Sequence, residues 1–342
     1  MLAVRSFAPG EPLRFEELPV PRPKGTEIRI RVGGCGVCHT DLHIARTNRI
    51  RVLRPLTLGH EVAGWIDAAG SGAAAALKRA RLAEGDGVLV YGGWGCGACT
   101  QCAAGAEQRC ERSASPGFQR DGGYADYMLV PHPRHLVPLG HLHPDHAAPL
   151  ADAGVTPWRA VQRAAAWLKP GARVLLIGFG GLGQFALQYL RLIPELTVAV
   201  RELSPEKLAL AGELGADLGL LEGDEALVGL GLGGPVDVVF DFVGNDPSLD
   251  YAARNVAPGG LVSVVGEGGG RYEFSFDRIP VEASLTTTAW GSFADLREVV
   301  RLAKRSRLKW HVERMPLSEA AAAHDRLAEG RVSGRIVLIP GA

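Results

Sequence analysis

One short glycine-rich segment constrains the fold more than any other part of the sequence. The run 173–178 is almost wholly apolar, as expected of a parallel strand buried on both faces. It leads directly into Gly178-Phe-Gly-Gly-Leu-Gly183, which opens a helical pattern over 182–192. In such a unit the first glycine makes the turn, the second lets the backbone approach a pyrophosphate, and the third lets helix and strand pack closely. The pattern predicts a dinucleotide-binding loop, and its phosphate-contacting residues are Gly178, Gly180, Gly181, Leu182 and Gly183.

The segments around this loop alternate between strand and helix patterns. Helical patterns cover 155–166, 182–192 and 205–214, and strand patterns cover 173–178, 196–200, 237–240 and 261–265. Such alternation predicts a doubly wound parallel sheet, the Rossmann arrangement. The first 150 residues instead show short strand patterns at 27–32, 88–91 and 124–130, and the last part has helices at 293–303 and 318–328 and a strand at 335–339. The fold class is therefore α/β, with an added loop-rich β domain.

Length and charge limit the possible functions. A chain of 342 residues is long enough for about two domains. Lysine plus arginine and aspartate plus glutamate both number 37, so the formal charge is zero. That balance argues against a nucleic acid or an anionic membrane as the partner, since both attract a basic excess. The first 21 residues include charged side chains and show no signal-peptide core, so we expect a soluble cytoplasmic protein that acts on a small molecule.

An acidic residue at the end of the second strand decides which dinucleotide is expected. Glu202 lies 19 residues after Gly183, close to the roughly 20-residue spacing at which a carboxylate accepts hydrogen bonds from the ribose hydroxyls of NAD. Arg201 beside it leaves NADP open, because a basic residue there can bind the 2′-phosphate. The sequence favours NAD.

Four cysteines form a compact cluster with metal-ligand spacing. They follow the pattern C-x2-C-x2-C-x7-C, at Cys96, Cys99, Cys102 and Cys110. Four thiolates complete the tetrahedral shell of zinc, which predicts a closed, structural site. An iron–sulfur ligand run would need its fourth cysteine three residues on, followed by proline, whereas Glu111 follows Cys110 here. Unliganded redox thiols are the other alternative.

A second group of possible metal ligands is more dispersed. Cys38 and His60 offer a thiolate and an imidazole from two separate loops, and together they could hold zinc and leave a position open for substrate. Taken alone, one cysteine and one histidine would more simply be a buried thiol and a hydrogen-bonded core histidine.

The sequence resembles the zinc-containing alcohol dehydrogenases of the medium-chain dehydrogenase/reductase superfamily in several motifs and in their order along the chain. Within that family it is most similar in general appearance to bacterial NAD-dependent secondary-alcohol dehydrogenases. The motifs are Gly36-Val-Cys-His-Thr-Asp41, Gly59-His-Glu61, the four-cysteine cluster, Ala153-Gly-Val-Thr156, the glycine loop and Gly334-Arg335. The resemblance covers essentially the whole chain. It implies a GroES-like catalytic domain over 1–151 and 286–342, with a structural zinc lobe at 94–112, around a Rossmann domain over 152–285.

The resemblance also assigns metal ligands. It implies that Cys38, His60 and Asp152 hold the catalytic zinc, and that the Glu61 carboxylate can visit the metal during ligand exchange. Without it, Asp152 would be read as a helix N-cap. Asp41 matches a residue that hydrogen-bonds a ligand histidine and so fixes its tautomer.

The remaining site residues are likewise implied by the resemblance. Thr40 matches the hydroxyl that touches the bound alcohol, and His43 matches the distal histidine of a proton relay, with an ordinary loop histidine as the alternative. His39 and Arg335 match residues that contact the pyrophosphate, and Thr156 matches one near the nicotinamide.

Together these features predict a zinc-dependent alcohol dehydrogenase. It would interconvert an alcohol, with secondary alcohols favoured, and its ketone or aldehyde, using NAD and two Zn²⁺ per chain, as a homodimer or homotetramer. A polyol or sugar-alcohol dehydrogenase is the alternative within the superfamily. A non-catalytic redox sensor that binds zinc and a nucleotide is the alternative from another class, and it would hold one labile zinc instead of two.

Overall fold

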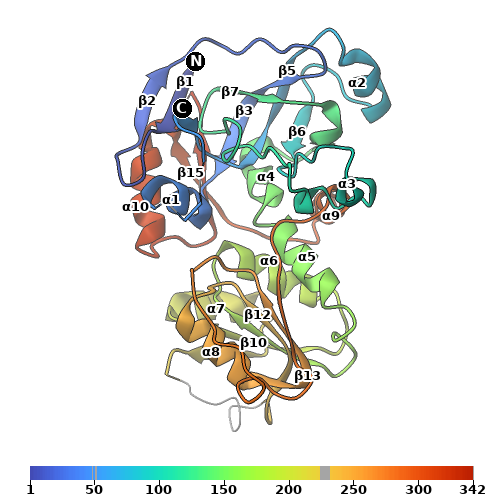
Figure 1. The fold of residues 1–342 in the computed structure, drawn as a ribbon, viewed down its shortest axis with the longest axis vertical. Coiled ribbons are helices and arrows are strands. Elements are labelled where there is room, and N and C mark those ends of the chain that lie inside the picture. The colour runs from blue at the N-terminus through green and yellow to red at the C-terminus, as the bar shows by residue number, and fades with distance from the viewer. Residues whose placement is uncertain (48, 51, 224–231, 342) are drawn as a thin grey trace. The chain divides into compact units, whose positions relative to one another are not determined.

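The computed structural model describes residues 1–47, 49–50, 52–223 and 232–341, and it divides the chain into two compact units (Figure 1). Unit 1 combines Met1–Val155 with Gly291–Ala342, and unit 2 is Thr156–Trp290. The chain thus leaves the first unit, builds the second and returns. We expected the exchanges at 151 and 286, but unit 1 extends to Val155 and resumes at Gly291. A Cβ on Gly291 would lie 2.6 Å from a methyl group of Val155, so these two positions pack against each other.

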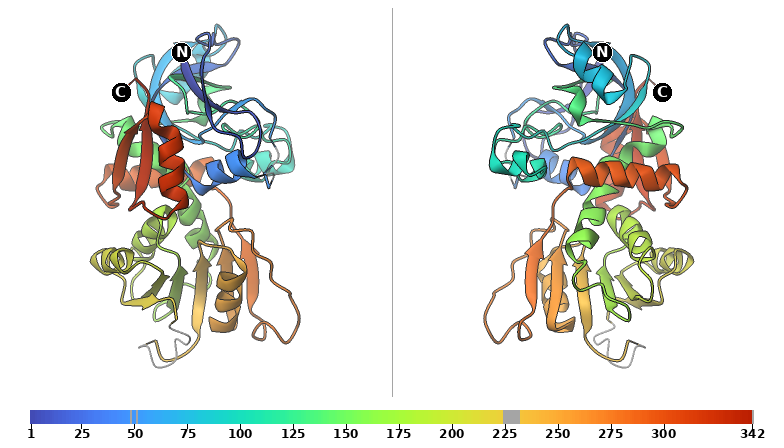
Figure 2. Two further views of the ribbon diagram at one scale, coloured as in Figure 1. Left: turned by 90° about the vertical axis from the view of Figure 1, so that its left-hand side faces the viewer. Right: turned by 90° about the vertical axis from the view of Figure 1, so that its right-hand side faces the viewer.

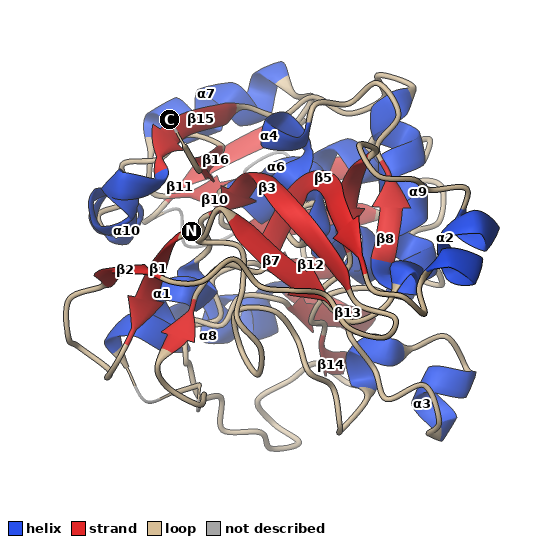
Figure 3. Cartoon of the chain, turned by 90° about the horizontal axis from the view of Figure 1, so that it is seen from above, coloured by secondary structure: helices blue, strands red, loops and turns tan. Residues whose placement is uncertain are grey.

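Unit 1 is built on a largely antiparallel sheet. Its strand order is β15-β16-β3-β5-β6-β8, with β7 paired to β3 (Figure 3), and β2-β1-β4 form a separate three-stranded sheet. The strands are β1 Leu2–Ser6, β2 Arg14–Glu17, β3 Ile28–Gly36, β4 Leu56–Thr57, β5 Glu61–Ala69, β6 Gly87–Val90, β7 Tyr127–Val130, β8 Leu136–Pro138, β15 Val312–Pro316 and β16 Arg335–Ile339. The helices are α1 His39–Arg46, α2 Ala74–Ala80, α3 Thr100–Ala103, α4 Pro144–Ala147, α9 Phe293–Lys304 and α10 Ala320–Ala328.

The pairing of β3 with β5 brings two loops of the chain together. Gly36, the last residue of β3, pairs with Glu61, the first residue of β5. Because the strands are antiparallel, the residues just after Gly36 and just before Glu61 emerge at the same end of the pair. Only glycine fits at position 36, since a Cβ there would collide with the Glu61 carboxylate. The register therefore places Cys38 and His60 side by side.

Unit 2 contains the predicted parallel sheet, which confirms the α/β fold class. All its strand pairs are parallel, in the order β11-β10-β9-β12-β13-β14, with helices packed against them (Figure 2). The strands are β9 Arg173–Ile177, β10 Thr197–Glu202, β11 Leu218–Leu221, β12 Val236–Asp241, β13 Val256–Val264 and β14 Ser284–Thr287. The helices are α5 Val155–Arg163, α6 Gly181–Leu190, α7 Pro205–Glu213 and α8 Asp246–Asn255.

Some elements differ from the predictions. The strand expected from residue 124 begins only at Tyr127, because the backbone of Tyr124 bonds instead to Leu58 and Val4. Helix α5 ends at Arg163 rather than at 166. Helices α1 and α8 were not predicted. For α8 the sequence does contain a helix-start signal, because Asn245 and Ser248 form a capping box at its N-terminus. Among the described residues, no helix has the length and apolar character needed to span a bilayer.

Candidate functional site

Four possible metal ligands from separate parts of unit 1 converge. One ligand atom from each of Cys38, His60, Glu61 and Asp152 lies within 4.8 Å of all the others, and the first three residues are buried. The Asp152 Oδ2 oxygen is 3.7 Å from Cys38 Sγ and 3.5 Å from His60 Nε2. The structure therefore brings together the three residues predicted to hold the catalytic zinc, with Glu61 beside them.

These separations fit a tetrahedral zinc ion. With ordinary zinc–ligand bond lengths, sulfur and oxygen ligands should lie about 3.5 Å apart, and nitrogen and oxygen ligands about 3.3 Å apart. The observed 3.7 and 3.5 Å are each within a few tenths of an ångström of these values. Sulfur, nitrogen and oxygen donors are all accepted by zinc, and three protein ligands are the usual number at a catalytic site.

A buried carboxylate orients His60 behind this ligand set. Asp41 Oδ1 lies 3.3 Å from His60 Nδ1, and the backbone N–H of Cys38 donates to Asp41 Oδ2 at 2.9 Å. The expected contact between Asp41 and a ligand histidine is thus present. Burial by itself would raise the pKa of Asp41, but His60 and the hydrogen bond from Cys38 outweigh it and hold the pKa below its usual value. With Nδ1 turned toward Asp41, the Nε2 atom of His60 faces the ligand set.

Glu61 forms a buried ion pair with Arg335. The Arg335 Nε donates to Glu61 Oε2 at 3.0 Å, its Nη2 bonds the other carboxylate oxygen, and its side chain is 6% exposed. The backbone N–H of Ala153 also donates to Glu61, at 3.1 Å. Burial raises the pKa of Glu61, with Arg335 acting in the opposite direction. The guanidinium of Arg335 is thus occupied by Glu61 here, and its contact with a pyrophosphate stays a prediction.

Helix α1 carries the other predicted polar residues of unit 1. Thr40 is half-buried, and its Oγ1 lies 3.7 Å from Cys38 Sγ. His43 follows three residues later, on the same face of the helix. Burial, together with the charge of Arg49, lowers the pKa of His43, so its imidazole is neutral near pH 7 and can accept a proton. His39 is exposed at the first position of α1. The predicted roles of these three residues stay predictions.

In unit 2 the three glycines of the loop meet three different demands. Gly178 has a φ of +87°, which favours glycine at the turn. A Cβ on Gly180 would meet no atom within 4 Å, so the backbone there is open to a ligand. A Cβ on Gly183 would collide with the carbonyl oxygen of Gly178, so helix α6 can pack against β9 only with glycine at this position. Gly181 and Leu182 begin α6 and present N-terminal N–H groups.

Glu202 lies at the end of β10, beside this loop. Its Oε2 accepts a hydrogen bond from the backbone N–H of Phe179 at 2.6 Å. Arg201 points elsewhere, since its guanidinium lies 4.4 Å from the centre of the Tyr251 ring and its side chain is 15% exposed. Of these two neighbouring side chains, the carboxylate of Glu202 and not the cation of Arg201 contacts the glycine loop.

Thr156 is buried in the first turn of α5.

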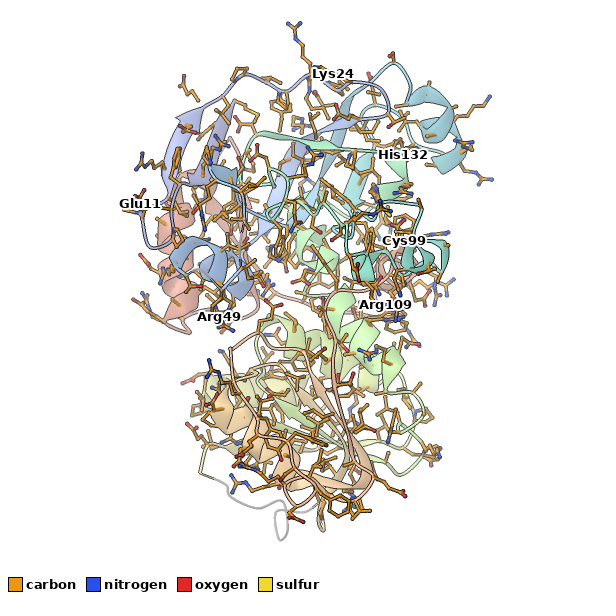
Figure 4. All side chains as sticks on the ribbon, in the orientation of Figure 1. Glu11, Lys24, Arg49, Cys99, Arg109 and His132 are labelled. Carbon is orange, nitrogen blue, oxygen red and sulfur yellow. The ribbon has the colours of Figure 1, made fainter. Side chains whose placement is uncertain are left out.

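The four cysteines of the lobe also form one group. The ligand atoms of Cys96, Cys99, Cys102 and Cys110 all lie within 4.8 Å of one another. The sulfurs of Cys99 and Cys110 are 3.8 Å apart, far beyond a disulfide bond and close to the ~3.8 Å expected between thiolates on a tetrahedral zinc. Hydrogen bonds from the backbone of Ala98 and Cys99 lower the pKa of Cys96 to about 6, which favours the metal-binding thiolate. Figure 4 labels Cys99 in this lobe.

Known proteins resemble this chain along its whole length. Residues 24–141 match the alcohol dehydrogenase GroES-like domain, and residues 181–305 match the zinc-binding dehydrogenase family. The chain belongs to the zinc-containing alcohol dehydrogenases. It is 35% identical to D-arabinose 1-dehydrogenase (NADP(+)) of Saccharolobus solfataricus, over 96% of this chain and 95% of that one. It is 32% identical to an NAD-dependent alcohol dehydrogenase of Sulfurisphaera tokodaii, over 99% of this chain and all of that one.

Solved structures agree with this assignment. The alcohol dehydrogenase of Aeropyrum pernix superposes with a TM-score of 0.91 at 34% identity, covering 99% of this chain and 100% of that one. These comparisons confirm the family and the fold class that the sequence of this chain predicts. It is a zinc-dependent oxidoreductase that acts on CH–OH groups, and its substrate is a small molecule.

Mutation of the four-cysteine lobe should affect metal content and stability. Cys99→Ser is expected to reduce the zinc content by one ion per chain and to increase proteolysis within 94–112, because the lobe has little apolar core to replace the metal. The melting temperature should fall by roughly 2–8 °C, equivalent to about 1–2 kcal/mol. Metal analysis and limited proteolysis measure this. Unchanged zinc content in Cys99→Ser would contradict a four-thiolate site.

Proposed function

We propose that this protein oxidises an alcohol, preferentially a secondary one, to its ketone with NAD, and catalyses the reverse reduction. The observation that carries the proposal is the convergence of Cys38, His60 and Asp152 at zinc-ligand distances. Three ligands leave a fourth position for a substrate oxygen, which distinguishes this group from the closed four-cysteine lobe.

The residues around this group suggest how protons are handled. Zinc held by Cys38, His60 and Asp152 would supply Lewis acidity that makes the alcohol proton easier to remove, and NAD would supply hydride acceptance. We assign the Thr40 hydroxyl as the first member of a proton relay, because it lies beside Cys38: Oγ1 accepts the alcohol proton while its own proton moves on. His43, neutral and one turn further along α1, would accept the proton that leaves this relay and release it to solvent.

The choice of NAD rests on Glu202. A carboxylate beside the glycine loop accepts hydrogen bonds from both ribose hydroxyls of NAD and repels the 2′-phosphate of NADP. Arg201, held over Tyr251, is turned toward another partner. Glu202→Gln is therefore expected to raise KM for NAD roughly tenfold or more, since hydrogen bonds to a charged group contribute about 1.5–3 kcal/mol. We expect kcat to change less than KM, and NADP to be used relatively better.

Steady-state kinetics with both cofactors measure this effect. Glu213→Gln, which neutralises an exposed carboxylate at the end of α7, is the matched control and should leave both values of KM unchanged. A parent enzyme that prefers NADP, or a Glu202→Gln variant with an unchanged KM for NAD, would contradict the assignment of Glu202.

A sugar or polyol substrate is the second candidate. It is favoured by one finding, the 35% identity to a relative named D-arabinose 1-dehydrogenase. Turnover of 2-butanol, 1-phenylethanol, xylitol and D-arabinose by the metal-replete protein, each with NAD, separates the two. The highest kcat/KM on the secondary alcohols supports the proposal, whereas the highest value on D-arabinose or xylitol supports the second candidate. No turnover of any alcohol would overturn both.

We further propose that the protein is a cytoplasmic homodimer or homotetramer. The cysteine thiols gathered at metal-ligand distances suit a reducing compartment. Light scattering should give two or four times the 36.2 kDa of one chain, and a monomer would contradict the oligomer proposal.

A further inference from the structure

A chain of buried polar side chains extends behind His60 toward the C-terminal part of unit 1. His60 Nδ1 contacts Asp41 Oδ1 at 3.3 Å, and Asp41 Oδ2 accepts a hydrogen bond from the hydroxyl of Tyr124 at 3.3 Å. The same hydroxyl lies 3.2 Å from Nε2 of His324, on helix α10. All four side chains are at most 2% exposed. Neither Tyr124 nor His324 belongs to a motif recognised from the sequence.

The hydrogen-bond donors and acceptors of these four side chains explain why each residue is needed. The Asp41 carboxylate accepts hydrogen bonds from three donors: the backbone N–H groups of Cys38 and Gly59 and the hydroxyl of Tyr124. Its Oδ1 also lies 3.3 Å from Nδ1 of His60, so these four contacts match the roughly four acceptor sites of a carboxylate. Because the single hydroxyl proton of Tyr124 goes to Asp41, the oxygen must accept the next bond from Nε2–H of His324. The hydrogen bonds from His324 and Tyr124 thus both run toward Asp41.

We propose that Tyr124 and His324 are positioning residues for the catalytic zinc: they hold Asp41 in the orientation in which it supports His60 as a ligand. The inference rests on the proposed function, since it requires zinc at Cys38, His60 and Asp152. Residues behind a ligand histidine typically change metal affinity or activity by 10–100-fold when mutated. Tyr124 lies one hydrogen bond further from the metal than Asp41, so the lower end of that range applies.

The ring of Tyr124 also has a packing role, and the test must separate it from the hydroxyl. A Cβ at Gly59, next to His60, would collide with this ring, so the ring occupies the space that glycine leaves open. Tyr124→Phe keeps the ring and removes only the hydroxyl. Tyr91→Phe is the matched control, because Tyr91 is equally buried in unit 1 and its hydroxyl donates at 2.9 Å to the backbone carbonyl of Gly291.

The rate of zinc transfer from the two-zinc protein to a colorimetric chelator tests the proposal. The phase that belongs to the catalytic site is identified by its absence in Cys38→Ala. In Tyr124→Phe and His324→Leu this phase should be about tenfold faster than in the parent. In Tyr91→Phe the rate of this phase should stay within about twofold of the parental rate. The same is expected of His324→Gln, because the glutamine amide can donate a hydrogen bond from nearly the same place as Nε2.

The outcomes distinguish the proposal from simple packing and from a failure of the proposed function. A parental release rate in Tyr124→Phe, or an equal acceleration in Tyr91→Phe, would overturn the positioning role. Equal rates for His324→Gln and His324→Leu would likewise show that His324 only fills space. A parent protein with zinc in the four-cysteine lobe alone would instead overturn the proposed function.

Discussion

Replacing Cys38 with alanine is expected to lower kcat/KM for alcohol oxidation by roughly 10³-fold or more. The substitution removes one of the three ligands proposed for the open zinc site, and Lewis-acid assistance by a metal contributes several kcal/mol to lowering a barrier. Each 1.36 kcal/mol corresponds to a factor of ten in rate. The affinity for NAD should change little, because the glycine loop and Glu202 belong to the other compact unit. Steady-state kinetics and titration of NADH fluorescence measure the two quantities.

The chain supplies a matched control for this experiment. Cys35 is also fully buried and lies three residues earlier, but it is not among the converging ligands. Cys35→Ala should therefore retain the zinc content and keep kcat/KM within a few-fold of the parent. If Cys38→Ala retained most of its activity, or if Cys35→Ala lost as much, the ligand assignment would be wrong.

Removing Arg335 should destabilise unit 1 strongly. Arg335→Ala leaves the Glu61 carboxylate buried without its cation, and breaking a buried ion pair by removing one partner costs about 3–5 kcal/mol. The exposed pair of Arg331 with Glu329 is the control, since their side chains are 62% and 54% exposed and such pairs contribute about 0–1 kcal/mol. Thermal or denaturant unfolding of metal-replete protein should show a large loss for Arg335→Ala and little change for Arg331→Ala.

A second variant separates loss of charge pairing from loss of packing. In the double variant Arg335→Ala with Glu61→Gln, no unpaired charge remains, so part of the lost stability should return. Equal stabilities of the single and double variants would show that the guanidinium of Arg335 acts through its volume and not through its charge.

The parts of the fold that the sequence predicts well are those encoded by local signals. Strand β9, the glycine loop and α6 are contiguous, so periodicity and glycine spacing are enough to predict them. The four cysteines lie within fifteen residues, and their spacing alone indicates a metal. Strand β16 was predicted with its observed bounds because its apolar run is followed closely by Pro340 and Gly341.

The contacts that sequence reasoning missed join residues far apart in the chain. Arg335 was assigned to a phosphate, but its guanidinium bonds Glu61, 274 residues away, and no spacing rule links the two. Likewise, Tyr124 and His324 are 200 residues apart and become neighbours only when α10 packs in unit 1. Asp152 could be named only through the resemblance, because a single aspartate before a helix is equally typical of an N-cap.

The most direct test of a catalytic zinc at Cys38, His60 and Asp152 is to measure zinc content and alcohol turnover together during stepwise chelation. The freshly purified protein should hold two zinc ions per chain. Turnover of a secondary alcohol with NAD should fall in proportion to the loss of the first ion and return when zinc is added back. Undiminished turnover in protein that retains zinc only in the four-cysteine lobe would contradict this site, as would inactive protein that holds both ions.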